Sequence, residues 1–468
     1  MKIFKIYTRK KKLLSDIITP VGIYLKIRDR FANSFLLESS DYHGEENSYS
    51  YICCRPIADF ELKNQIVKMN FPDGSSEQKT DLVGDSVLSR LKYFSRSFQG
   101  VDEPNTKNIQ TGMFGYMAYD AIENFETIEL TNREKLLPDI RYTVFRYIIA
   151  FNHFKNECSV IENYWKDKND DEFNEIVELI NQKSIPSFQF RANNRKHSNF
   201  TDDEFLRIVK NGIHHCDIGD VFQVVFSRRF IQGFQGDEFQ VYRSLRSINP
   251  SPYLFYFDYG SYKLFGSSPE AQIVVDKGKA VIYPIAGTFR RSGNDKADAE
   301  LAKKLLDDPK ENSEHIMLVD LARNDLSRCC SSVKVESYKE IQYYSHVIHL
   351  VSKVSGTLDA NKDSLDIVTS TFPAGTLTGA PKHKAMQLIN EKENLSRGFY
   401  GGAIGFMDFE GNFNHAIMIR TFLSQANKLI FQAGAGVVAL SNPNNEVKEV
   451  YNKIAALESA IRAASEIY

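Results

Sequence analysis

Helix-like and strand-like segments follow one another in this chain without a regular alternation, and that irregular order limits the possible folds more than any other feature. Helical patterns are expected at 201–216, 297–306 and 382–388, and differing numbers of strand-like segments separate them. A doubly wound or (β/α) barrel fold would instead alternate its strands with crossover helices. We therefore predict the α+β class.

A charged, asparagine-rich stretch divides the 468-residue chain. It contains the runs KDKNDDE and RANNRK, a composition typical of a connector. Before it, short β-rich runs alternate with turn residues, which indicates an antiparallel sheet region. We therefore expect an N-terminal region at 1–165, a connector at 166–198 and a second domain at 199–468.

The charge balance gives no reason to expect a polyanionic partner. The chain carries 58 basic and 60 acidic residues, so its formal net charge is −2. This excludes a strong general attraction to nucleic acid or to an anionic membrane. The chain also lacks an apolar signal segment and any run of about 18 apolar residues. We expect a cytoplasmic protein with a small-molecule substrate, no nucleic acid and no membrane.

The six cysteines have neither the C-x-x-C spacing of a zinc or redox site nor a Gly-x-Cys-x-Gly setting. We interpret them as reduced, mostly structural thiols. A cysteine nucleophile for amide hydrolysis is therefore not expected.

Two glutamate pairs are candidates for a metal site. Glu311 and Glu314 lie in the first turn of an expected helix whose body is largely apolar. Glu446 and Glu449 share a face of a second helix, which Asn442-Pro443 can cap and begin. Carboxylates without histidine or cysteine suit Mg²⁺. The alternative is that both pairs are ordinary surface charges, since spacing alone does not distinguish the two.

Glycine clusters and three isolated residues are further candidates. His349 lies in an apolar run and is either a neutral base or a hydrogen-bonded core residue. Arg420 suits a bidentate carboxylate, and Glu270, if desolvated, suits a general acid. Glycines at 287, 375, 401–405 and 434–436 either let the backbone approach an anion or form turns and strand crossings.

Read together, these segments resemble the chorismate-utilising enzymes, and in particular component I of anthranilate synthase. The two longest matching segments read DPKENSEHIMLVDLARNDL and PAGTLTGAPK. The resemblance is strong over 199–461, and weaker in the N-terminal half, where it rests on Leu-Leu-Glu-Ser at 36–39.

The resemblance implies an α+β fold with a large β-sandwich core flanked by helices, and chorismate as substrate. It implies Mg²⁺ held mainly by Glu314 and Glu449, with Glu311 and Glu446 in support. Substrate contacts carried over from the family are Gly287, Thr288, Tyr400, Arg420, Gly434, Ala435, Gly436 and Lys453. Glu270 matches the acid that protonates the departing C4 hydroxyl, His349 matches the histidine of pyruvate elimination, and Thr376 is a further catalytic candidate.

Two positions distinguish the related reactions. Gln223 stands where similar isochorismate and salicylate synthases carry a lysine that activates water, so ammonia is the expected nucleophile. Ala286 stands where aminodeoxychorismate synthases commonly carry a nucleophilic lysine. Both favour anthranilate and pyruvate as products. The alternatives are an aminodeoxychorismate synthase component I and a non-catalytic tryptophan-sensing protein.

The resemblance also implies partners and regulation. Glu38 and Ser39, together with Pro252, Tyr253 and Leu254, match the family's tryptophan-binding segments, so feedback inhibition by tryptophan is expected. Ammonia should come from glutamine through a separate glutamine amidotransferase subunit. The loop around Phe289-Arg290-Arg291 departs from the family pattern, which leaves its substrate contacts open.

Overall fold

The protein is described by a computed structural model, which covers residues 2–39, 48–80, 86–101, 109–134, 136–343 and 347–467. The helices are α1 (Pro20–Arg28), α2 (Val87–Arg96), the 3-10 helix η1 (Tyr119–Asn124), α3 (Asp170–Asn181), α4 (Asp202–Asp217), α5 (Phe239–Ile248), α6 (Asp295–Asp307), α7 (Pro309–Ser327), α8 (Ser364–Thr371), α9 (Gly375–Thr378), α10 (Lys382–Lys392) and α11 (Pro443–Ala464).

The strands of the first half are β1 (Phe4–Leu14), β2 (Phe35–Glu38), β3 (Tyr49–Lys63), β4 (Ile66–Asn70), β5 (Ser76–Lys79), β6 (Phe98–Gly100), β7 (Gly112–Met117), β8 (Ile140–Asn152), β9 (Glu157–Tyr164) and β10 (Phe190–Ser198). Those of the second half are β11 (Gln223–Gly236), β12 (Tyr253–Asp258), β13 (Lys263–Ser268), β14 (Ala271–Asp276), β15 (Lys279–Ile282), β16 (Ile285–Arg290), β17 (Cys330–Tyr343), β18 (Val347–Leu358), β19 (Gly379–Ala380), β20 (Ala403–Asp408), β21 (Phe413–Ile417), β22 (Thr421–Gln425) and β23 (Lys428–Val437).

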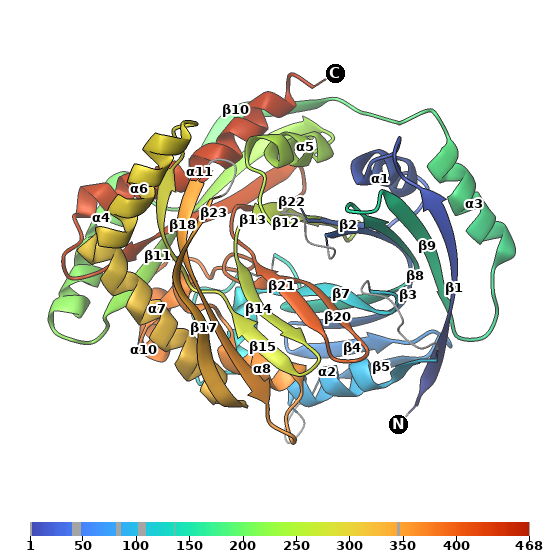
Figure 1. Ribbon diagram of the computed structural model, residues 1–468, viewed down its shortest axis with the longest axis horizontal. Coiled ribbons are helices and arrows are strands. Elements are labelled where there is room, and N and C mark those ends of the chain that lie inside the picture. The colour runs from blue at the N-terminus through green and yellow to red at the C-terminus, as the bar shows by residue number, and fades with distance from the viewer. Residues whose placement is uncertain are drawn as a thin grey trace.

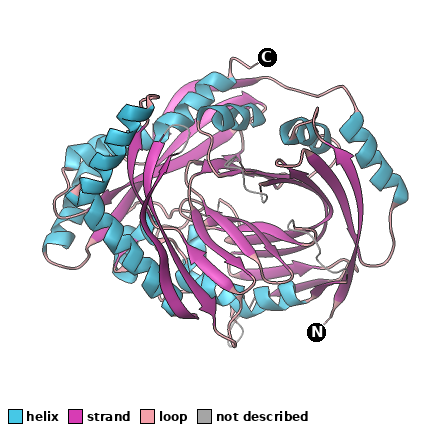
Figure 2. Ribbon diagram, in the orientation of Figure 1, coloured by secondary structure: helices cyan, strands magenta, loops and turns pink. Residues whose placement is uncertain are grey.

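Most of the strands pair antiparallel, and helices lie along the outside of them (Figures 1 and 2). Strands of the two halves pair directly, because β2 pairs with β12 and β7 pairs with β20. Apolar residues of both halves therefore share the same buried clusters. The predicted α+β class is confirmed.

The stretch expected to be a connector contains regular structure. Asn169 accepts a hydrogen bond from the backbone of Glu172 and so caps α3, whose inner face buries Phe173, Ile176 and Ile180. Strand β10 follows and pairs with β11. Charged residues of α3, among them Asp171 and Glu178, form the exposed face of this amphipathic helix.

Two helices carry the expected glutamates. Helix α11 begins as predicted, with the Asn442 side chain accepting hydrogen bonds from the next turn and Pro443 at the first position. Its buried residues, among them Val450 and Ile454, pack against α5 and β23. Helix α7 packs against β16, β17 and β18.

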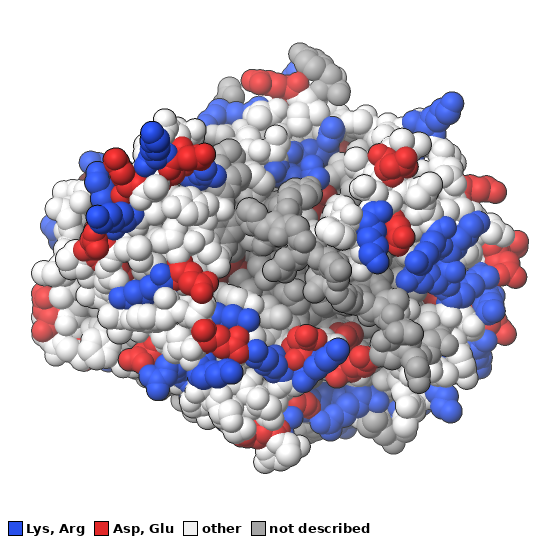
Figure 3. All heavy atoms as spheres, viewed as in Figure 1, with Lys and Arg blue, Asp and Glu red and all other residues white. Residues whose placement is uncertain are grey.

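The surface carries mixed charges. On the face drawn in Figure 3, basic and acidic side chains are interspersed. Among the helices that the structure describes, none is both long and apolar enough to cross a membrane. All six cysteines are free thiols, as expected.

Candidate active site

The carboxyl group of Glu270 is the chemical centre of the site. Glu270 precedes β14, and the Thr376 hydroxyl, from the short helix α9, donates a hydrogen bond of 3.0 Å to its Oε1. Burial raises the pKa of Glu270 to about 7, although the Thr376 hydroxyl, Lys453 and Arg420 each favour the charged form. A carboxyl group with this pKa can donate a proton near neutral pH.

Arg420 lies close enough to Glu270 to act on its charge, and its backbone has a left-handed conformation. It has a positive φ of 50° just before β22, and its Nη1 donates a hydrogen bond of 3.2 Å to Oδ1 of Asn249. Burial lowers the pKa of its guanidinium from the usual value, while Glu270 raises it. The remaining guanidinium donors are suited to a carboxylate ligand.

His349 is next to Arg420 and is kept neutral by its surroundings. It lies on β18 opposite Thr288 of β16, and its Nδ1 is 3.1 Å from the carbonyl oxygen of Gly287. Burial lowers the pKa of the imidazole, and Arg420 lowers it further, while the Gly287 contact raises it. The side chain of Thr288 itself lies outside the described residues.

Gly287 forms a bulge that brings β16 close to α7. Its φ is +64°, and a Cβ atom there would lie 2.4 Å from Cδ1 of Leu305 and 3.1 Å from Oε2 of Glu311. Glycine is therefore needed at this position. Glu311 thus borders the same site as His349.

Glu314 and Glu449 reach the site from two different helices. Nε2 of Gln223, on β11, donates a hydrogen bond of 3.1 Å to Oε1 of Glu314. On α11, Glu449 forms an ion pair of 2.7 Å with Lys453, whose Nζ also donates a hydrogen bond of 2.9 Å to the Gly434 carbonyl. The two carboxylates therefore flank the paired strands β11 and β23.

The four glutamates do not form a ready-made metal cage. In the described part of the chain, no three histidine, cysteine or acidic side chains lie close enough to hold a metal together. Glu446 is buried and Glu311, Glu314 and Glu449 are partly exposed. This oxygen donor set fits Mg²⁺, which commonly takes one or two protein carboxylates and completes its coordination with water and substrate oxygens.

The glycines of β23 let other groups approach the strand. The strand runs through Gly434–Gly436 rather than ending before them. A Cβ atom at Gly434 would lie 2.7 Å from the Phe226 carbonyl oxygen and 3.1 Å from Oη of Tyr400, and one at Gly436 would lie 2.6 Å from Nε2 of Gln223. Burial raises the pKa of the Tyr400 phenol, so this group stays protonated.

Replacing Gly434 by alanine is expected to lower the free energy of unfolding by about 1–3 kcal/mol, because the new methyl group must push β23 away from β11. Urea denaturation followed by fluorescence measures this change. Gly100→Ala is a matched control, since a Cβ atom there would meet nothing closer than 3.5 Å. Equal stability of the two variants would contradict the tight approach.

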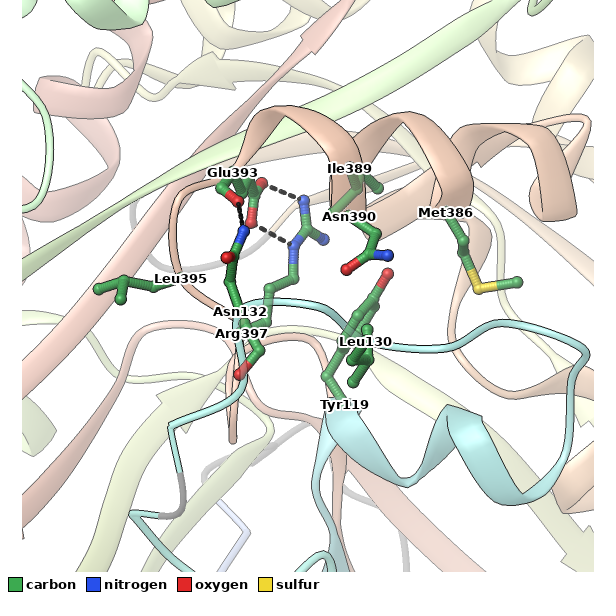
Figure 4. A pocket seen from close by; sticks show the side chains of 10 residues that line it. Tyr119, Leu130, Asn132, Met386, Ile389, Asn390, Glu393, Leu395 and Arg397 are labelled. Carbon is green, nitrogen blue, oxygen red and sulfur yellow. Dashed lines mark hydrogen bonds and ion pairs between the residues drawn. The ribbon is translucent and has the colours of Figure 1, made fainter.

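A buried ion pair, which was not anticipated from the sequence, links α9 to β11. Arg397 and Glu393 form an ion pair of 2.7 Å, and Nη1 and Nη2 of Arg397 donate hydrogen bonds of 2.6 Å to the carbonyl oxygens of Leu377 and Val225. Figure 4 shows the pair beside Tyr119. Arg397 therefore ties α9, which carries Thr376, to β11, which carries Gln223.

The predicted tryptophan-binding residues come together at a second place. Leu254 on β12 pairs with Glu38 on β2, and Tyr253, Pro252 and Ser39 are their chain neighbours. Two residues that no sequence motif indicated donate hydrogen bonds to the Glu38 carboxylate, namely Tyr242 at 2.6 Å and Arg246 at 3.0 Å. Asn249, at the end of the helix α5 that carries Tyr242 and Arg246, accepts a hydrogen bond from Arg420 of the candidate active site.

The chain is similar to several known proteins. The family model described as chorismate binding enzyme matches residues 35–459. Anthranilate synthase component 1 of Aquifex aeolicus is 35% identical over 97% of this chain and 94% of its own length. The protein of the same name from Mycobacterium tuberculosis is 36% identical over 98% of this chain and 93% of its own.

Solved structures agree with these relatives. Anthranilate synthase component I from Streptococcus pneumoniae superimposes with a TM-score of 0.75 at 29% identity, covering 96% of this chain and 99% of that one. The menaquinone-specific isochorismate synthase of Escherichia coli has a TM-score of 0.74 at 17% identity, covering 98% of this chain and 95% of its own, which shows a shared fold.

Proposed function

This chain belongs to the chorismate-binding enzymes, in the anthranilate synthase component I group, and we propose that it forms anthranilate and pyruvate from chorismate and ammonia. The observation that carries the proposal is the desolvated Glu270, with a pKa of about 7, between the Thr376 hydroxyl and the cations Arg420 and Lys453. A proton donor beside two cations suits a dianionic substrate that must lose a hydroxyl group.

Each residue would contribute a separate part of the reaction. Arg420 and Tyr400 orient the enolpyruvyl carboxylate, and Glu270 delivers its proton to the C4 oxygen, which leaves as water while ammonia bonds to C2. His349, neutral and buried, is suited to the later loss of pyruvate. Glu314 and Glu449, supported by Glu311 and Glu446, would hold Mg²⁺. When bound, this ion supplies positive charge for the ring carboxylate.

The choice of ammonia rests on Gln223 and Ala286. Gln223 is 4% exposed and its amide donates to Glu314, so it has no basic group with which to activate water. Ala286 lies on β16 next to Gly287 and offers no nucleophile to the ring. These two residues support anthranilate over isochorismate and 4-amino-4-deoxychorismate.

A separate subunit would supply the ammonia. Five of the six cysteines are buried, and burial raises the pKa of Cys53, Cys54, Cys158, Cys216 and Cys330, so these thiols are poor nucleophiles. We therefore propose a glutamine amidotransferase as the partner. The purified chain should use ammonium salts but not glutamine until that subunit is added.

The decisive assay incubates the chain with chorismate, MgCl₂ and ammonium sulfate. Anthranilate is followed by its fluorescence, and pyruvate by a coupled lactate dehydrogenase reaction. We expect equal amounts of the two products. Recovery of 4-amino-4-deoxychorismate without pyruvate would instead assign the chain to the aminodeoxychorismate reaction.

Replacing Glu314 by alanine is expected to lower kcat/KM by more than about 100-fold at saturating Mg²⁺, because a carboxylate that would bind the ion is lost. Mn²⁺ binding in the presence of chorismate, measured by electron paramagnetic resonance, should weaken as well. Glu300→Ala, on the exposed side of α6, is the control. Unchanged activity and ion binding in Glu314→Ala would refute the metal role.

Tryptophan is proposed to inhibit through the site around Glu38. The side chain of Glu38 is 6% exposed, and its carboxylate accepts hydrogen bonds from Tyr242 and Arg246. This carboxylate is suited to bind the ammonium group of tryptophan. Millimolar tryptophan should lower the rate of the wild-type chain, and Glu38→Gln should respond only at higher concentrations. An equal response of both proteins would contradict this site.

A further inference from the structure

A small cavity lies beside Glu270 on the side of α7. Its volume is about 40 Å³, and its polar lining residues are Glu270, Gln272, Tyr283, Asp325, Thr371 and Thr376. A buried water molecule needs roughly 10–15 Å³ of cavity volume, so this cavity has room for more than one. Its lining includes Glu270, Thr376 and Gly375 from the candidate residues, and none of the substrate or metal contacts carried over from the family.

The side chain of Gln272 provides a second, independent observation. Gln272 is 4% exposed, and its Nε2 donates a hydrogen bond of 3.0 Å to Oγ1 of Thr371. Among the described residues, its Oε1 has no hydrogen-bond partner although it is buried. Because buried amide oxygens almost always accept a hydrogen bond, a water molecule in the cavity that Gln272 lines is the expected donor.

The other end of the cavity is bordered by a buried ion pair. Nζ of Lys382 lies 2.7 Å from Oδ2 of Asp325 and donates a hydrogen bond of 2.8 Å to the Thr371 carbonyl oxygen. The side chains are 9% and 12% exposed, so the pair retains slight contact with solvent. Thr371 thus touches both Lys382 and Gln272.

The charges around these two carboxyl groups differ. Lys453 and Arg420 act on Glu270 from the substrate side. Lys382, Arg328 and Glu126 act on Asp325, and burial raises the pKa of this carboxyl group. Both acids are therefore able to hold a proton at higher pH than an exposed carboxyl group can.

We infer that ordered water in this cavity joins Gln272 and the Glu270 carboxyl group to Asp325, and that Glu270 recovers its proton through this water after each turnover. The inference rests on the proposed role of Glu270 as the acid. After Glu270 has given its proton to the departing hydroxyl, a cavity water donates a proton to the carboxylate. That water takes a replacement proton through the Asp325 carboxylate from the Lys382 ammonium group, and this pair regains a proton from solvent.

Two variants interrupt the water without touching the substrate side. Gln272→Leu removes the oxygen that holds the water, and Ala322→Val, on α7, adds two carbon atoms to the cavity lining. Ala299→Val, at an exposed position of α6, is the matched control. A high-resolution crystal structure of the wild-type chain should contain water within hydrogen-bond distance of Gln272 Oε1.

Both cavity variants should lower kcat by about 10-fold at pH 8, with unchanged KM for chorismate, because proton return becomes slow. Small acids such as imidazolium should restore the rate in the variants and leave the wild type unaffected, a rescue that a purely structural defect would not give. A dry cavity in the crystal structure, or variants whose kcat stays at the wild-type value, would overturn the inference.

One measurement separates this inference from the proposed function. The carboxyl group of Glu270 is titrated by infrared difference spectroscopy, with Glu270→Gln as the reference. Its midpoint should rise in Gln272→Leu, because the carboxylate loses a hydrogen-bond donor, and an unchanged midpoint would count against the water. If the wild-type chain made no anthranilate, the proposed function would fail, while the crystal structure and this titration would still decide on the water.

Discussion

Replacing Glu270 by glutamine is expected to lower kcat for anthranilate formation by about 100- to 10,000-fold, the range that loss of a general acid usually costs. Glutamine keeps the size of the side chain and still accepts the Thr376 hydrogen bond, but it has no proton to give. Chorismate binding should change little. The measurement is a steady-state titration with chorismate that separates kcat from KM.

The pH dependence tests the same group in the unmodified protein. Because burial raises the pKa of Glu270 to about 7, the carboxyl group is protonated below that pH and ionised above it. An acid must be protonated to act, so kcat/KM should fall as the pH rises through about 7. The small residual activity of Glu270→Gln should lack this alkaline decline.

The control for this change is Glu300→Gln on the exposed side of α6, which should keep the wild-type rate and profile. If Glu270→Gln retained more than about a tenth of the wild-type kcat, the acid would have to be sought elsewhere. If the alkaline decline persisted in the variant, it would belong to another group.

Replacing Arg397 by methionine is expected to lower the free energy of unfolding by about 3–5 kcal/mol, the cost of leaving a buried charge without its partner. The side chains of Arg397 and Glu393 are 1% and 3% exposed. After the change, Glu393 would keep its hydrogen bonds from Ser227, whose backbone nitrogen and hydroxyl both donate to its Oε1 at 2.8 Å. Chemical denaturation followed by circular dichroism measures the loss.

A double variant distinguishes a lost pair from lost packing. In Arg397→Met with Glu393→Leu no charge remains buried, so part of the stability lost in the single variant should return. Arg207→Met, at an exposed position of α4, is the control and should stay near the wild-type stability. A double variant less stable than the single one would mean that the pair acts mainly through its contacts with Leu377, Val225 and Ser227.

The sequence alone predicted the structural features that depend on residues close together in the chain. The start of α11 at Asn442-Pro443 follows from a side-chain cap and a fixed φ angle, both of which act within one turn. The charged composition of 166–198 did not reveal that this stretch contains α3, because the apolar stripe of that helix is defined by the core that it covers.

The candidate site depended on motifs that could be recognised and on contacts that could not. The resemblance identified Glu270, Thr376, Arg420 and His349 as site residues. It did not show the hydrogen bond between Thr376 and Glu270, which lie 106 positions apart in the chain. Spacing along one helix also left the glutamate pairs undecided between metal ligands and surface charges. The approach of Glu314 to Gln223, and of Glu311 to Gly287, comes from the packing of α7 on the sheet.

By itself, the sequence determined the class of fold, the family, the helix starts and the residue types available for chemistry, because these depend on composition, order and local hydrogen bonding. Only the tertiary structure decided the raised pKa of Glu270, the burial of Arg397 with Glu393, and the cavity behind Gln272. The physical reason is that desolvation is produced by segments far apart in the chain. A residue's charge state and its unmet hydrogen bonds exist only once those segments have packed around it.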